Sequence, residues 1–429
     1  MFHSEPYSVL RGVHTQRLPN GITAVLDPGD LPPYAVLGCC FASGAASDPA
    51  GRTGLTHFLE HMMFKGTPRY SEAAVSAWLV REGATQNALT SYDFTLYHKT
   101  VPSAALMDAL DLELDRLENL QLDPGTVDVE RAVILNEILT THHSWATLLG
   151  AAQMQLLAGT GYAHPVIGHT VDVRRIGAED MRAHHAAYHR TDQLIVSVSG
   201  HFDAGDVLHA LQQVPARPPA PPVGPTRGSS ATVGVLQHDP AQRRLVVALP
   251  SAPVTALTFP IMVVLDAVLC GVTGTGFFAG AATPGPGARG LLGVALQRAG
   301  LATYVAGGLL PTRAGFMWPI RVEYSSTTSL DVVLRAIHAT FAHLQREPIS
   351  APHLQQILKG LRAQLTFSLD SRTRRAWSAA TWQAIAGLET FQQLPEQLGR
   401  VTAHDLQRLA QAHLHLPESS TPRAVGMPS

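Results

Sequence analysis

The sequence is poor in charge, in lysine and in cysteine. Charged residues make up 15% of its 429 residues and apolar residues 45%, and the formal net charge is −2. This balance is typical of a compact globular protein and excludes an intrinsically disordered chain. Only three lysines occur and no basic run is present, so the clustered positive charge that nucleic-acid binding requires is missing. We therefore expect no nucleic-acid partner.

Long apolar runs are also missing. The longest, residues 259–270, is interrupted by Asp266 and is too short to span a bilayer. The first residues lack the basic and then apolar pattern of a secretory signal. Cys39, Cys40 and Cys270 are too few for a disulfide framework, and the adjacent pair is expected to point to opposite faces of a strand. Together these absences predict a cytoplasmic protein with no membrane partner.

A proline-rich stretch divides the chain near its middle. Residues 214–230 read VPARPPAPPVGPTRGSS, a composition that favours extended, semi-rigid chain. Segments 176–188 and 401–413 both begin with an acidic first turn and continue as an apolar-periodic helix. The stretch and the repeat predict a duplicated domain. The predicted units are a metal-binding domain at 1–214, a linker at 215–230 and a homologous second domain at 231–429.

Strand-like and helix-like segments alternate in the first half of the chain. Their lengths indicate an α+β protein with two mixed α/β domains, each an antiparallel-rich sheet covered by helices. The predicted strands are 21–26, 35–41, 90–100 and 194–200, and the predicted helices are 55–64, 72–82, 104–120 and 127–140.

The stretch THFLEHMMF at 56–64 is the strongest chemical signal. His57, Glu60 and His61 stand at helical positions i, i+3 and i+4, so they share one face. Zinc binds neutral imidazole and carboxylate, and a catalytic zinc site usually has three protein ligands and one open position. H-x-x-E-H is the signature of inverzincins. The alternative is an amphipathic helix that carries imidazoles by chance. A third metal ligand elsewhere in the sequence would favour the metal site over this alternative.

A second helix offers the third ligand. Glu130 and Glu137 are seven residues apart and therefore lie on one helix face, two turns from each other. One of them can reach a metal while the other supports a histidine ligand. A solvated acidic face is the alternative. The apolar run 133–135 argues against it, because it indicates a buried helix in which carboxylates need partners.

With these motifs the sequence resembles the inverzincin zinc peptidases typified by pitrilysin, insulysin and the mitochondrial processing peptidase. It is most similar to their short bacterial members with two domains. The resemblance rests on the segment 57–61, on the helix 130–137 that ends 76 residues after the second histidine, and on 83–97, GATQNALTSYDFTLY. The tetrapeptide PVIG at 165–168 is a weaker match.

The resemblance implies roles for five residues. His57, His61 and Glu137 would bind one Zn²⁺ per chain. Glu60 would be the catalytic general base, and Glu130 would complete the catalytic set as the carboxylate behind a ligand. No second H-x-x-E-H occurs, so one active site per chain is expected.

Substrate-binding residues are implied on two further segments. Asn87 and Ala88 would lie on the strand edge to which a peptide backbone adds as an extra strand. The family's second domain presents an Arg and a Tyr in a pattern like L-R-x-x-G-L-A-Y. Here 296–304 read LQRAGLATY, which places Arg298 and Tyr304 one position along. Because a slip of one residue turns a strand side chain to the other face, the role of this pair stays open.

Three functions remain in view at this point. The first is a zinc endopeptidase that encloses unfolded peptides in a clamshell chamber. The second is a catalytic subunit that is active only beside a metal-free homologue. The third, a non-catalytic homologue, is opposed by the four intact site positions. The short members of the family pair two chains around the chamber, so we expect a homodimer or a heterodimer. The displaced Arg298 and Tyr304 favour the unlike pair.

Overall fold

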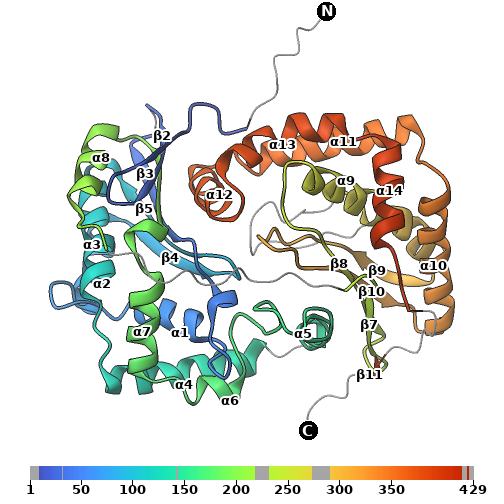
Figure 1. Ribbon diagram of the computed structural model, residues 1–429, viewed down its shortest axis with the longest axis horizontal. Helices are drawn as coiled ribbons and strands as arrows, with labels where there is room; N and C mark the ends of the chain where they lie inside the picture. Colours follow the sequence, from blue (N-terminus) through green and yellow to red (C-terminus); the bar gives the residue numbers. More distant parts are fainter. Residues whose placement is uncertain are drawn as a thin grey trace, which may run out of the picture.

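Two β-sheets, one from each half of the chain, form the framework of the molecule (Figure 1). The computed structural model describes residues 9–30, 32–141, 144–217, 231–272, 290–417 and 423–424. Both sheets are covered by helices, which confirms the predicted α+β class with two mixed units. Most of the predicted linker lies outside the described residues, so the domain boundaries stay a prediction. Within the described part of the chain, no helix is both long and apolar enough to cross a membrane.

The first sheet has six strands in the order β1-β2-β6-β3-β5-β4. All neighbouring strands are antiparallel except β2 and β6, which run parallel. Cys39 and Cys40 are buried on opposite faces of β3, as the sequence predicts. The strands are β1 (His14–Arg17), β2 (Thr23–Pro28), β3 (Tyr34–Phe41), β4 (Thr85–Thr90), β5 (Thr95–Pro102) and β6 (Leu194–Gly200).

The prediction of one strand over 90–100 is wrong. The chain turns after β4 and returns as β5, and the Ser91 N–H donates to the Phe94 carbonyl at 2.9 Å to close the hairpin. The β-branched and aromatic content of the segment favours strand throughout. The turn forms because Asp93 has buried partners there, among them the Tyr162 hydroxyl at 2.9 Å. The hairpin leaves β4 at the edge of the sheet.

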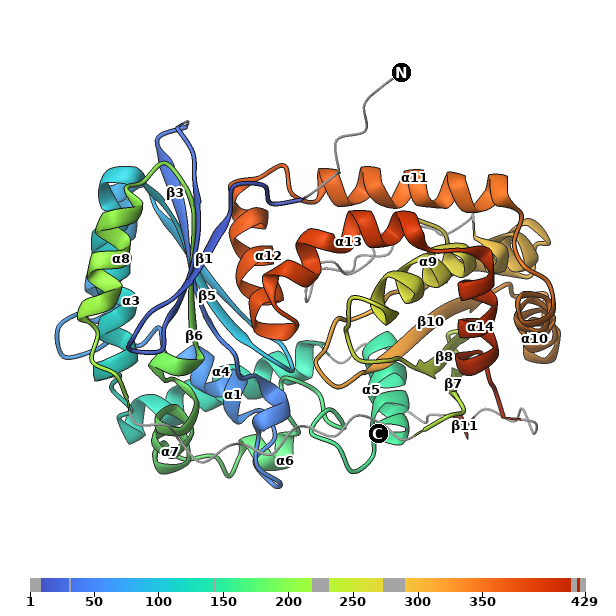
Figure 2. The same ribbon diagram turned by 45° about the horizontal axis from the view of Figure 1, so that its top comes forward.

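Six helices of the first half lie around this sheet in two groups. Helices α3 and α8 cover its outer face, and α1, α4, α6 and α7 gather at one end of it (Figures 1 and 2). The helices are α1 (Leu55–Met62), α2 (Glu72–Glu82), α3 (Leu106–Asn119), α4 (Pro124–Thr141), α5 (Ser144–Leu156), α6 (Thr170–Val173), α7 (Ala178–Tyr188) and α8 (Ala204–Gln213).

The second half of the chain forms a five-stranded sheet with the order β11-β7-β8-β10-β9, in which the last strand lies at the edge, whereas β6 lies inside the first sheet. Helices α7 and α14 share one N-terminal arrangement, in which Asp180 and Asp405 accept from the backbone N–H of Gly177 and Thr402 at 2.9 and 3.0 Å. The strands are β7 (Val235–Asp239), β8 (Arg244–Pro250), β9 (Ala302–Ala306), β10 (Met317–Tyr324) and β11 (Arg423–Ala424). The helices are α9 (Thr258–Cys270), the short η4 (Gly293–Arg298), α10 (Leu330–Arg346), α11 (Ala351–Phe367), α12 (Arg372–Ile385), α13 (Leu388–Arg400) and α14 (Ala403–His413).

Each half contributes a helix to the sheet of the other half. Helix α5 packs on the second sheet, and α12 packs on the inner face of the first sheet (Figure 2). On α12, Arg375 forms two contacts of 2.7 Å with the Asp27 carboxylate of β2. The Ser197 hydroxyl of β6 donates to the Ala376 carbonyl at 2.9 Å. The two halves are therefore joined by packing and polar contacts as well as by the chain.

Candidate metal centre and substrate cleft

Helix α1 carries the H-x-x-E-H residues and is capped by a residue outside it. Gly54 precedes the helix with φ of 87°, and a Cβ there would lie 2.5 Å from the Ile167 carbonyl oxygen. Asp48 supplies the cap, since its carboxylate accepts from the N–H groups of Gly54 and Thr56 at 2.7 and 2.9 Å. A carboxylate is favoured there by the unpaired N–H groups and by the helix dipole. The first turn of the motif helix is thereby fixed.

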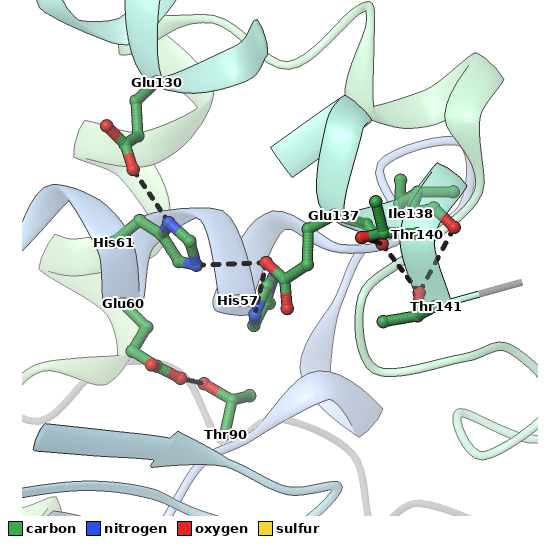
Figure 3. Close-up of polar contacts among 9 residues, drawn as sticks. All are labelled: His57, Glu60, His61, Thr90, Glu130, Glu137, Ile138, Thr140 and Thr141. Carbon is green, nitrogen blue, oxygen red and sulfur yellow. Dashed lines mark hydrogen bonds and ion pairs between the residues drawn. The ribbon is translucent and has the colours of Figure 1, made fainter. Parts of the chain in front are cut away.

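The structure brings His57, His61 and Glu137 together (Figure 3). Oε2 of Glu137, on α4, lies 3.6 Å from Nε2 of His61 and 3.9 Å from Nε2 of His57, both on α1. With bonds of about 2.0–2.1 Å, ligand atoms around a tetrahedral zinc ion lie about 3.4 Å apart. Among the described residues, no other three His, Cys, Asp or Glu side chains come together in this way.

The chemistry of this donor set fits zinc. Burial, with a smaller effect of His61, lowers the pKa of His57 to about 3, so the imidazole is neutral at neutral pH. Neutral imidazole is the form that binds a metal ion. Calcium and magnesium prefer all-oxygen sites, whereas two imidazoles and one carboxylate are a common zinc set.

Glu130 supports His61 from behind. One of its carboxylate oxygens lies 2.8 Å from His61 Nδ1, and the other lies 2.8 Å from Lys65 Nζ. Because an ionised carboxylate only accepts, Nδ1 must carry the proton and Nε2 is left free to face Glu137. Burial alone would raise the pKa of Glu130, but the hydrogen bonds from Lys65 and His61 outweigh burial and hold that pKa below its ordinary value. Glu130 therefore remains ionised.

Glu60 lies beside the ligands and is held by Thr90. The Thr90 hydroxyl, at the end of β4, donates to Oε2 of Glu60 (Figure 3). Burial raises the pKa of Glu60, and the hydrogen bond from Thr90 opposes that rise. A carboxylate offers about four lone-pair sites, so Glu60 can still accept a proton from water.

A cleft of about 920 Å³ opens onto these residues. Its walls come from β4, from α5 and from residues 165–170. Asn87 and Ala88 lie on the cleft, and the Ala88 N–H donates to the Asn87 side-chain oxygen at 2.8 Å. Because β4 pairs only with β5 among the described strands, its other edge is available for a further strand.

Arg298 and Tyr304 do not line this cleft. Arg298 is exposed at the end of η4. Tyr304 is half-buried on β9, and its ring centroid lies 6.2 Å from that of Trp145 on α5. Their role in substrate binding stays a prediction, and within one chain Tyr304 contacts the helix that forms a wall of the cleft.

Three residues that hold the motif were missed by reasoning from sequence: Asp48, Lys65 and Thr90. Lys65 had a usable signal, because it is one of three lysines and follows the motif by four residues. Thr90 falls inside the segment 83–97 that carries the resemblance, but nothing in the sequence connects it with Glu60. Asp48 could be found only by asking what caps a helix that begins after glycine.

Residues 32–169 match the model of the family "Insulinase (Peptidase family M16)". The chain is 27% identical over 211 residues to the mitochondrial-processing peptidase subunit beta of Blastocladiella emersonii, a match covering 48% of this chain and 44% of the relative. It is 28% identical over 227 residues to an uncharacterized zinc protease of Streptomyces coelicolor, covering 50% of each. The chain spans about half the length of the curated relatives it matches.

Solved structures share the fold over nearly the whole chain. A protease from Helicobacter pylori has a TM-score of 0.81 at 19% identity, covering 94% of this chain and 96% of that one. A peptidase M16 inactive domain from Pseudomonas fluorescens has a TM-score of 0.77 at 16% identity, with coverages of 94% and 95%. Pitrilysin has a TM-score of 0.73 at 16% identity, and the match covers 96% of this chain but 45% of pitrilysin.

Proposed function

We propose that this chain, which through residues 32–169 belongs to the insulinase (M16) peptidase family, is a zinc-dependent endopeptidase of unfolded peptides. The observation that carries the proposal is the convergence of His57, His61 and Glu137 beside the buried Glu60 in a cleft. The inactive domain from Pseudomonas fluorescens shows that the fold alone does not decide activity. The proposal therefore rests on the residues of this site.

The two histidines and Glu137 would hold one zinc ion and leave a fourth position open. When bound, zinc lowers the pKa of a coordinated water towards about 7 and polarises a carbonyl group. Glu60 takes the proton from the attacking water and returns it to the leaving amine. Thr90 keeps that carboxylate in place. Glu130, paired with Lys65, fixes the orientation of the His61 ring.

The edge of β4 is the proposed binding site for the peptide backbone. Asn87 and Ala88 face the cleft, and Thr90 at the end of the same strand contacts Glu60. A peptide that adds as an extra strand is recognised mainly through main-chain hydrogen bonds. Most backbone groups of a folded protein are already hydrogen-bonded within it, so the expected substrates are unfolded segments.

We propose that two chains enclose the substrate. Pitrilysin, of the same fold, is about twice as long as this chain, so a second chain would supply the missing half of such an assembly. The partner would be either a second copy or a metal-free homologue. Arg298 and Tyr304, which lie outside the chain's own cleft, could then serve the partner's site.

The decisive experiment uses the full chain purified alone. We expect about one zinc per chain by elemental analysis and cleavage of a mixed library of unfolded peptides. Light scattering then separates the assemblies: an active homodimer whose activity collapses in Arg298→Ala contradicts the unlike pair. A dimer or monomer that binds zinc and barely cleaves the peptides supports the unlike pair, a heterodimer with a metal-free homologue. A chain that binds no zinc contradicts the proposed function.

A further inference from the structure

Helix α5 has two faces that serve different halves of the molecule. Leu148, Ala152 and Leu156, spaced four residues apart, are buried in a cluster with residues of the second sheet. The other face of the helix forms a wall of the cleft at the candidate metal centre. The residues on the cleft side are Ala146, Thr147, Gly150, Ala151 and Met154.

Side-chain contacts hold α5 on the second half. The Trp145 ring centroid lies 6.2 Å from that of Tyr304 and 5.1 Å from the guanidinium carbon of Arg244. Further along the helix, Gln237 donates to the Gln155 side-chain oxygen at 2.9 Å. The second half of the chain thus positions one wall of the cleft, although its described residues contain no group of three candidate metal ligands.

The lining of the cleft favours uncharged groups. Its described residues include no Lys, Arg or Asp, and its two carboxylates, Glu60 and Glu137, belong to the candidate metal centre. Burial of a Leu or Phe side chain is favourable, whereas burial of a charged group without a partner is disfavoured. The cleft therefore suits an apolar side chain.

Gly150 is the residue of this wall that packing does not explain. It lies within a helix of 13 residues, where glycine stabilises the helix less than alanine does. A Cβ at this position would meet no atom within 4 Å, and its φ is not in the left-handed region. Neither close contact nor backbone conformation requires the glycine. The space beside it belongs to the cleft.

We propose that α5 is the specificity wall of the enzyme and that Gly150 makes room for a large apolar side chain next to the scissile bond. The inference rests on the proposed peptidase function. The accepted class is an aliphatic or aromatic residue, and the second half of the chain selects it by holding α5 in place.

The test compares Gly150→Leu with the native chain on peptides that differ only beside the scissile bond, carrying Phe, Leu, Ala, Lys or Glu. A Cβ at Gly150 would meet no atom within 4 Å, so Gly150→Leu is expected to extend into the cleft, to fold at least as stably and to keep its zinc content. We expect kcat/KM for the Phe peptide to fall by about 10- to 100-fold and that for the Ala peptide by less than about threefold. Ala77→Leu, on the exposed surface of α2, is the matched control and should change neither.

Two results would overturn the inference. The first is a native enzyme that prefers Lys or Glu beside the scissile bond. The second is an unchanged preference for the Phe peptide over the Ala peptide in folded, zinc-loaded Gly150→Leu. If the native chain cleaves nothing, the proposed function fails separately. Binding of the labelled Phe and Ala peptides to Glu60→Gln protein, measured by fluorescence anisotropy, then decides the inference. Tighter binding of the Phe peptide, lost on adding Gly150→Leu, supports it, and equal binding contradicts it.

Discussion

The Lys65 ammonium lies 2.8 Å from the Glu130 carboxylate, whose other oxygen contacts His61. Glu130 is nearly buried, with 8% of its side chain exposed, so its charge depends on these two partners. Lys65 is thereby connected to a candidate metal ligand that it does not touch. It is also 3.4 Å from Glu72, at the start of α2.

This relationship predicts graded losses of metal affinity. Glu130→Gln should weaken zinc binding by about 10- to 100-fold, as the removal of a group that supports a ligand commonly does. Lys65→Met should weaken it by about 10-fold, while Lys65→Arg keeps the positive charge and should stay near native. Competition with a chromogenic chelator measures all three. Glu72→Gln, at an exposed partner, is the control, and native affinity in Lys65→Met would remove Lys65 from this role.

The three candidate ligands should each be necessary for the metal. Alanine in place of His57, His61 or Glu137 removes one of three protein ligands, so the purified variants should contain almost no zinc. His169→Ala is a matched control, because His169 lines the same cleft outside the group of three. Elemental analysis of the dialysed proteins is the measurement. Full zinc in His57→Ala would show that the assignment is wrong.

Glu60 and Thr90 should act on turnover and leave metal binding intact. Glu60→Gln is expected to lower kcat by about 10² to 10⁴, because an amide cannot take a proton from water. Thr90→Val removes the hydroxyl that holds Glu60 and should lower kcat by about 10-fold, with Thr90→Ser near native. In a Glu60→Gln background Thr90→Val should have no further effect. If Thr90→Val lowered kcat by the same factor in the Glu60→Gln background as in the native chain, Thr90 would not act through Glu60.

The ion pair of Arg375 and Asp27 should stabilise the contact of α12 with the first sheet. Asp27 is buried, and Arg375→Leu leaves its carboxylate with the Ser199 hydroxyl and with Arg372 at 3.7 Å. We expect the free energy of unfolding to fall by about 2–4 kcal/mol. Urea denaturation measures it. Arg400→Leu, in an exposed pair on α13, should be nearly neutral, and equal losses in the two variants would contradict the prediction.

Asp266 on α9 should make stability depend on pH. Burial raises the pKa of Asp266 to about 6, against hydrogen bonds from Trp318 Nε1 and the Gly308 N–H and the nearby charge of Arg321. The pKa of an Asp side chain in the unfolded chain is about 3.9. Between that pH and the folded pKa of about 6, the folded protein keeps a proton on Asp266 that the unfolded chain has lost. This contribution is complete below about pH 4 and falls by about 3 kcal/mol as pH rises through 6.

Asp266→Asn should remove that component. Urea denaturation of both proteins from pH 4 to 7.5 gives the two pH profiles, and their difference isolates Asp266 from other titrating groups. Parallel profiles would contradict the prediction.

Local patterns predicted α1, α2, α3, α4 and α7 within a few residues, because apolar periodicity and acidic first turns are properties of short segments, whereas α5, α6 and α8 were not predicted. The spacing of His57, Glu60 and His61 likewise required only helix geometry. The break between β4 and β5 could not be predicted in this way, because it depends on Tyr162, far along the chain from Asp93. Support of Glu60 by Thr90 depends on tertiary packing in the same way.

The exchange of α5 and α12 between the halves has a thermodynamic consequence. Chains with two separate cores commonly unfold in steps, one unit at a time. Here, melting of either half uncovers an apolar sheet face in the other, so neither sheet stays completely covered alone. The whole chain should therefore lose its structure in a single cooperative transition. A substitution that loosens α12 should lower the melting temperature of the distant helices α1 and α4, which carry the candidate metal ligands, as much as that of α12 itself.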